Sequence, residues 1–195
     1  MVTKATFSGN LTTPLTHADL EIRTGQEYVI PMKDFGVSTT LADLPTAGDA
    51  TSLGLVSGTH GSASPVLRGS DVGATTATEK ARVLFQLPQE YVAGQSVTVR
   101  LHAEMEVVAD SAATADIECY ESDDEAGIGS DLCTTAAQNI NSSTYADYDF
   151  TITASTLAAG DVLDIEITTV ATDAGNAAPN IWAVIGKVSV LLGVR

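Results

Sequence analysis

The alternation of hydrophobic and polar residues is the strongest structural signal in the chain, and it is clearest in residues 96–107, SVTVRLHAEMEV. Every second residue from Val97 to Val107 is hydrophobic, while the residues between them are polar or charged. Because successive side chains of a strand point to opposite faces, this pattern predicts a long strand with one buried and one wet face. The same alternation recurs at 114–120 and 162–170. Repeated half-buried strands are typical of antiparallel sheets.

Five further segments have the composition of strands, which gives about eight strands in all. They are residues 27–31, 51–57, 81–87, 145–153 and 181–192. The last is hydrophobic on both faces and is expected in a central or covered position. Stretches rich in Gly, Pro, Asn and Asp separate the strands, and helix is expected at most as short turns such as TATEKAR at 76–82. The sequence therefore predicts an all-β, antiparallel two-sheet sandwich of about eight strands with jelly-roll-like connections.

The chain is expected to form one domain with an extended N-terminal arm. Its 195 residues fall in the usual range for a single sandwich. Residues 1–24 mix Thr, Ser, Gly, Asn and Pro with isolated hydrophobic residues and lack a strand period. We therefore assign 1–24 to an arm that packs on a neighbouring molecule, and 25–195 to the β-sandwich.

The charge distribution excludes several classes of partner. The formal net charge is -16; residues 1–100 carry 7 basic and 9 acidic side chains, whereas residues 101–195 carry 2 and 16. Nucleic acids and anionic membranes are bound by clustered Lys and Arg, so neither is expected as a partner. No stretch approaches the roughly 18 apolar residues of a membrane span, and the N-terminus lacks a secretory pattern, so a soluble chain is expected.

The sequence shows no constellation of catalytic residues. The three histidines are His17 in the arm, His60 in a Gly/Ser loop and His102 on the polar face of a strand. Ser62 and Ser64 lie near His60, but no nucleophile elbow surrounds them, and a surface loop is the favoured interpretation. No glycine motif for phosphate binding occurs either. We therefore expect no enzymatic activity, no catalytic residue and no cofactor.

An acidic loop at 121–131 leaves calcium binding open. It contains Glu121, Asp123, Asp124, Glu125 and Asp131. Carboxylates are the ligands that calcium prefers, but the spacing departs from that of an EF-hand loop. The favoured interpretation is a solvated loop that discourages aggregation, and no metal site is assigned.

Two further features are ambiguous from the sequence. Cys119 and Cys133 could pair, although a reducing compartment of synthesis favours free thiols. Trp182 lies in the most hydrophobic strand, where packing in the core is favoured over a sugar-stacking role.

Three stretches resemble a known class of protein. They are LRGSDVGATTATEKARVLFQLPQEYVAGQSVTVRLHAEM at 67–105, ESDDEAGIGSDLCTTAAQNINSSTYADYDFTIT at 121–153 and LAAGDVLDIEITT at 157–169. They resemble uncharacterised structural proteins that tailed phages encode and that are found in aquatic viral sequences. The resemblance implies a small β-sandwich attached to a capsid, as a cement or decoration protein, typically trimeric, or as a minor head or tail component. It implies no active-site residue.

The expected function is therefore a non-enzymatic structural role in a phage particle, most specifically that of a capsid cement or decoration protein. The expected partners are the major capsid protein or other virion proteins and further copies of the chain, with a trimer favoured. The expected location is the virion, after synthesis in the host cytoplasm. The alternatives are a carbohydrate- or receptor-binding jelly roll on a head fibre or tail and, less favoured, a glycan-degrading or cupin-like enzyme, although three scattered histidines do not suffice for a cupin metal site.

Overall fold

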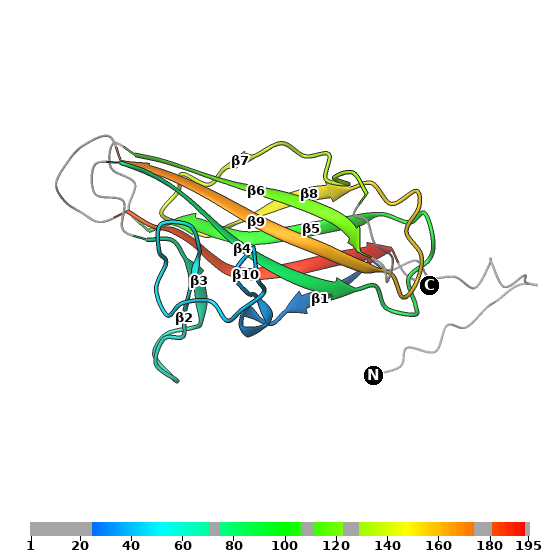
Figure 1. Cartoon of the computed structure of the whole chain (residues 1–195), viewed down its shortest axis with the longest axis horizontal. Helices are drawn as coiled ribbons and strands as arrows, with labels where there is room; N and C mark the ends of the chain where they lie inside the picture. The colour runs from blue at the N-terminus through cyan, green and yellow to red at the C-terminus, as the bar shows by residue number, and fades with distance from the viewer. Residues whose placement is uncertain (1–24, 71–74, 107–110, 123–128, 174–180, 194–195) are drawn as a thin grey trace, which may run out of the picture.

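Two antiparallel β-sheets face each other in the protein and are offset by the twist of their strands (Figure 1). The computed structural model describes residues 25–70, 75–106, 111–122, 129–173 and 181–193. Sheet A consists of β1 (Gly25–Ile30), β2 (Gly54–Val56), β3 (Val66–Arg68), β5 (Val97–Met105), β8 (Ala146–Ile152) and β10 (Ala183–Gly193). Sheet B consists of β4 (Thr76–Gln86), β6 (Ser111–Ser122), β7 (Gln138–Asn139) and β9 (Val162–Asp173).

The order of the strands is that of a jelly roll. Sheet A has the order β2-β3-β10-β5-β8, with β1 also pairing with β10, and sheet B has the order β4-β9-β6-β7. If the β2–β3 hairpin is set aside, β1-β10-β5-β8 faces β4-β9-β6-β7, which is the arrangement of eight strands in two Greek keys. The predicted all-β, jelly-roll-like sandwich is confirmed. The hairpin is an insertion between the first two strands of the roll and extends sheet A beside β10.

The period-two pattern correctly predicts which residues face the interior. In β5 the alternate residues from Val97 to Met105 are buried, and the residues between them are partly exposed. Cys119 in β6 and Ile165 in β9 point inward as expected. The doubly hydrophobic segment becomes β10, which lies centrally between β5 on one side and β1 and β3 on the other.

The core is one continuous layer between the two sheets. Burying a Leu, Ile or Phe side chain contributes roughly 1.5–3 kcal/mol relative to leaving it in water, so this layer dominates the folding free energy. Its largest fully buried side chains are Phe150, Leu53, Leu67, Leu87, Leu101, Met105, Ile117, Ile140, Leu157, Leu163, Ile165 and Ile167.

The expected helical turn at 76–82 is wrong, because these residues form the first part of β4. They pair in register with β9, from Thr76 opposite Thr172 to Gln86 opposite Val162. Their inward positions include Glu79, which is 1% exposed. A carboxylate at an inward position interrupts the hydrophobic alternation, which is why the sequence pattern conceals the strand. The short strands β3 and β7 were also missed, and the strand expected at 51–57 is reduced to Gly54–Val56.

The β2–β3 hairpin is held by close backbone contact with the loop before it. Leu55 donates its backbone N–H to Pro45 O at 2.7 Å. A Cβ atom on Gly54 would lie 2.1 Å from the carbonyl carbon of Ala47, a distance that no real contact allows. The loop and the hairpin can therefore pack together only if position 54 has no side chain.

The predicted arm, residues 1–24, lies outside the described residues. The helical segment in the described ranges is the three-residue η2 (Met32–Asp34), and none of these residues forms a helix that could cross a membrane.

A prediction follows for Gly54. Gly54→Ala should lower the unfolding temperature by about 4–8 °C, because forcing a methyl group into closed packing costs about 2 kcal/mol. Gly129→Ala is the matched control, since a Cβ there meets no atom within 4 Å. Thermal unfolding followed by circular dichroism measures both variants. An unchanged unfolding temperature for Gly54→Ala would show that this loop and hairpin are not packed as described.

Candidate functional site

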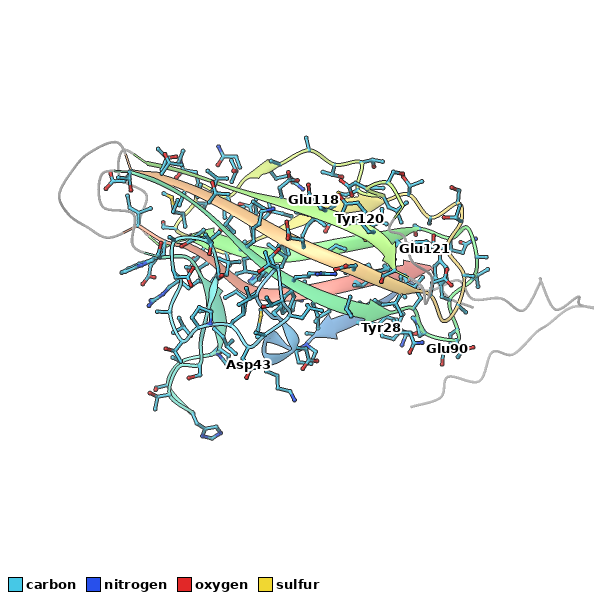
Figure 2. The ribbon with its side chains drawn as sticks, viewed as in Figure 1. Tyr28, Asp43, Glu90, Glu118, Tyr120 and Glu121 are labelled. Atoms are coloured by element: carbon cyan, nitrogen blue, oxygen red, sulfur yellow. The ribbon has the colours of Figure 1, made fainter. Side chains whose placement is uncertain are left out.

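The outer face of sheet B carries the densest group of charged side chains. The register places Arg82 opposite Glu166, and Glu166 opposite Glu118, so that one row crosses β4, β9 and β6. In the neighbouring row Asp164 lies opposite Tyr120. Figure 2 shows Glu118 and Tyr120 on β6, on the side of sheet B turned away from sheet A. The side chains surround an open pocket of about 150 Å³, which is lined by Ser38, Arg82, Glu118, Tyr120, Asp164 and Glu166.

Most of these charged side chains form hydrogen bonds with side chains of neighbouring strands. Arg82 binds Asp164 with two nitrogens, and its Nε lies 2.6 Å from Asp164 Oδ1. Glu166 accepts hydrogen bonds from Lys80 Nζ and Ser38 Oγ. Asp164 is almost completely buried beneath the guanidinium group. The charges of Arg82 and Lys80 thus compensate those of Asp164 and Glu166. Glu118 is the third carboxylate of the group.

Glu118 and Glu166 form a carboxyl pair with unequal proton affinities. Burial raises the pKa of Glu118, and the charge of Glu166 raises it further, against the opposing effect of Lys80. Burial also acts to raise the pKa of Glu166, but the hydrogen bonds from Lys80 and Ser38 outweigh it, so this pKa is lowered.

The outer face of sheet A carries a second polar network, centred on His102. Its Nδ1 lies 2.7 Å from Asp147 Oδ1, and its ring stacks on Tyr145 with centroids 5.0 Å apart. Arg100 binds Asp149 with two nitrogens at 2.6 and 2.7 Å. The hydrogen bond from His102 lowers the pKa of Asp147, and Arg100 lowers it further. Burial and the neighbouring charge of Glu104 raise the pKa of Tyr145 to about 12, so its hydroxyl stays protonated at neutral pH.

Trp182 lies at the surface beside this network. It was expected in the core, but it is half-buried, one residue before β10. The guanidinium group of Arg68 lies over its ring, 4.8 Å from the centroid, and Arg68 also pairs with Glu106 at 3.8 Å. A half-buried Trp ring is a surface that can stack on the flat face of a sugar ring.

The other candidates from the sequence do not come together. His60, Ser62 and Ser64 are exposed on the loop between β2 and β3, where Ser62 Oγ donates to Thr59 O at 3.1 Å. His17 lies outside the described residues.

The acidic loop is only partly described. Asp123, Asp124 and Glu125 lie outside the described residues. Glu121 accepts a hydrogen bond from Thr156 Oγ1, and Asp131 Oδ1 accepts two backbone N–H groups. Within the described ranges, no three His, Cys, Asp or Glu side chains are grouped so as to hold a metal ion.

Each Lys and Arg of the described residues is in an ion pair with an acidic side chain. The exposed pairs among them stabilise the fold by at most about 1 kcal/mol each, and the pairs together leave the described residues without a cluster of unpaired cations. The pairs are Lys33–Asp34, Arg68–Glu106, Lys80–Glu166, Arg82–Asp164, Arg100 with Asp147 and Asp149, and Lys187–Glu27.

The residues that build these networks were not identified as a site from the sequence. Asp164 and Glu166 were correctly placed on the outer face, but their partners on β4 and β6 depend on the register between strands. Three segments of the sequence carry charged residues at alternate positions. This pattern predicts that their side chains lie on an outer face, but it does not predict which of them pair across strands.

Comparison with known proteins gives little guidance on function. No protein-family model and no curated protein matches the chain. One solved structure with some likeness is that of the arabinose-bound MgGH51 α-L-arabinofuranosidase, with a TM-score of 0.39 and 11% identity over 94% of this chain. This chain spans about a quarter of that enzyme's length, since 26% of it is covered. A likeness of this size assigns neither a family nor an activity.

A prediction follows for the carboxyl pair. Glu118→Gln should raise the unfolding temperature at neutral pH by about 1–2 °C, because facing like charges on adjacent strands cost roughly 0.5 kcal/mol. A carboxyl with a raised pKa in the folded state favours folding at low pH, and that contribution is lost as the pH rises through its folded-state pKa. The difference in unfolding temperature between Glu118→Gln and the parent should therefore vanish well below pH 4.5, the ordinary pKa of Glu, and grow toward neutral pH.

Thermal unfolding across this pH range measures the effect. Asp116→Asn is the matched control, because Asp116 lies on the same face of β6 but opposite Thr168. A Glu118→Gln variant that is less stable than the parent at neutral pH would contradict the assigned repulsion.

Proposed function

We propose that this chain is a non-enzymatic structural protein of a phage particle, which binds the capsid shell as a cement or decoration protein. The observation that supports this most directly is the uneven distribution of exposed hydrophobic side chains. Among the described residues the large ones are Val29, Leu41 and Leu84, at 58%, 41% and 48% exposed. All three belong to the near-neutral first half of the chain.

These residues flank the same edge of the sandwich. β1 is an edge strand of sheet A and β4 an edge strand of sheet B, and the two strands meet where Tyr28 contacts Phe85 edge to face at 6.1 Å. Within the described ranges β1 pairs only with β10. A mostly apolar pocket of about 440 Å³ lies near the end of β1, lined by Met32, Lys33, Leu55, Ser57, Ser64, Pro65 and Gly186. We propose that this edge, termed here the β1/β4 edge, supplies the contacts with the shell and between copies, with a homotrimer favoured.

The opposite edge has the character of a solvent-exposed surface. It is formed by β7 and β8, where Asp147 and Asp149 lie on the outer face (Figure 1). Because the exposed large hydrophobic side chains of the described residues lie outside β7 and β8, association through the β1/β4 edge is the favoured orientation. The proposed location is therefore the virion surface, after synthesis in the host cytoplasm, with neither nucleic acid nor membrane as a partner.

A second candidate function is carbohydrate or receptor binding by a head-fibre or tail component. The observation that favours it is the outward position of Trp182 and Tyr145 on sheet A. Trp182 is the single tryptophan of the chain, so its fluorescence would report a sugar bound at this face.

A prediction tests the β1/β4 edge. The double variant Val29→Glu/Leu84→Glu should bind particles lacking the chain at least about 10-fold more weakly than the parent, because it places charges in a hydrophobic contact. The double variant Thr151→Glu/Thr153→Glu is the matched control, since it adds the same two charges at exposed positions at the end of β8. Co-sedimentation with particles measures binding, and circular dichroism verifies folding. Equal binding of the folded double variant and the control would exclude this edge as the contact surface.

A further prediction tests the role in the particle. A protein that binds the intact shell and not its dissociated parts stabilises the shell by mass action. Particles without the chain should therefore release their DNA at a lower temperature. Because the proposed contacts are hydrophobic, the difference should persist at salt concentrations that screen surface charges. Identical release temperatures with and without the chain would reject the cement role and favour the receptor-binding alternative.

A further inference from the structure

The segment from Asp131 to Thr135 connects the two sheets on the side opposite the β1/β4 edge. Leu132 donates its backbone N–H to Cys119 O of β6 at 2.7 Å, and Leu132 O accepts the backbone N–H of Thr153, just after β8, at 2.8 Å. Thr134 donates to Thr151 O of β8 at 2.9 Å. The segment is therefore hydrogen-bonded to sheet B on one side and to sheet A on the other.

Both cysteines of the chain lie at this junction. Asp131 Oδ1 accepts the backbone N–H of Cys119 and that of Cys133, each at 2.9 Å. Because both nitrogens bind the same oxygen atom, they lie within about 6 Å of each other. The two backbones therefore approach each other closely, as the Cα separation of about 4.4–6.8 Å in a disulfide requires.

The two side chains also face the same region. Cys119 lies at an inward position of β6 and is fully buried, and Cys133 packs against the core from the connecting segment. Burial, followed by the neighbouring Cys133, raises the pKa of Cys119 to about 12. Burial also raises the pKa of Cys133. At neutral pH both groups are therefore neutral thiols, close enough to influence each other.

We propose that Cys119 and Cys133 are a disulfide site, at which oxidation ties β6 of sheet B covalently to the segment that pairs with β8 of sheet A. The oxidant is a small-molecule disulfide such as oxidised glutathione. The Cys133 thiolate, which is the more exposed, attacks the oxidant and forms a mixed disulfide, releasing one glutathione thiolate. Cys119 then loses its proton and attacks the Cys133 sulfur, releasing the second glutathione. Two protein thiols are oxidised and one disulfide of glutathione is reduced to two thiols.

This inference does not depend on the proposed function. The reaction should be slow and should accelerate as the pH rises, because the attacking species is the thiolate and both thiols resist deprotonation. In the reduced chain Cys133 Sγ donates to Thr135 O at 3.6 Å, and disulfide formation removes this hydrogen bond because the thiol loses its proton.

The experiment treats the full-length folded chain with oxidised glutathione at mildly alkaline pH, or with dithiothreitol as the reduced reference. We expect the monomer to lose two hydrogens in its mass, both cysteines to resist alkylation after denaturation, and a peptide pair linked through Cys119 and Cys133 to appear after digestion. The oxidised chain should unfold about 5–10 °C higher than the reduced chain, because the bond closes a loop of about 15 residues in the unfolded state.

Cys133→Ser is the control variant, and its unfolding temperature should not respond to oxidised glutathione. If it does not fold, Cys119→Ala serves the same purpose. Three results would overturn the proposal: both thiols remaining free for alkylation after oxidation, glutathione remaining on Cys133 without exchange, or a cross-link only between chains.

Discussion

The hydrophobic layer between the two sheets is the interaction on which the rest of the structure depends. A twisted sheet with one apolar face is not stable alone in water, and here each sheet buries that face against the other. The central strands contribute fully buried side chains to this layer, among them the inward side chains of β9 from Leu163 to Ile167 and those of β5 from Val97 to Met105. Once this layer fixes which face of each strand is inside, most charged side chains of the strands are directed onto the two outer faces, and Glu79 is an exception. The charged networks are thus a consequence of the core.

The outer networks explain how a chain with a net charge of -16 tolerates so many carboxylates on paired strands. Arg82 and Arg100 each lie between acidic side chains of neighbouring strands and bind a carboxylate with two nitrogens. Two-point binding by guanidinium is the strongest form of ion pair at a surface, and it also fixes the register of the strands. At Glu118, burial raises the pKa of the carboxyl, and the negative charge of Glu166 raises it further. These networks link side chains of neighbouring strands across the outer face of each sheet.

The sequence predicted the faces of the strands better than their neighbours. Period-two alternation is a local property, so β5, β6, β9 and β10 could be located and their buried residues identified. The sequence missed β7, because a two-residue strand has no period, and misassigned the start of β4, because Glu79 occupies an inward position. Glu79 is tolerated there since it accepts the backbone N–H of Ser70 at 2.5 Å, a contact between residues nine apart that no pattern reveals. Pairings such as Arg82 with Asp164 depend on contacts between distant residues and require the structure.

The two edges of the sandwich are closed in different ways, and this asymmetry bears on how the molecule associates. On the β7/β8 side the segment 131–135 forms backbone hydrogen bonds with both sheets, so the backbone groups there are largely paired. On the other side, Gly36 and residues 51–53 pair with β4 near Lys80 and Arg82, but this cover does not extend to Leu84. A strand edge that is neither covered nor charged is a place where proteins pair with one another. The edge that remains open is the one where Val29 and Leu84 are exposed. The asymmetry between the two edges therefore favours association through the β1/β4 edge, on which the proposed function rests.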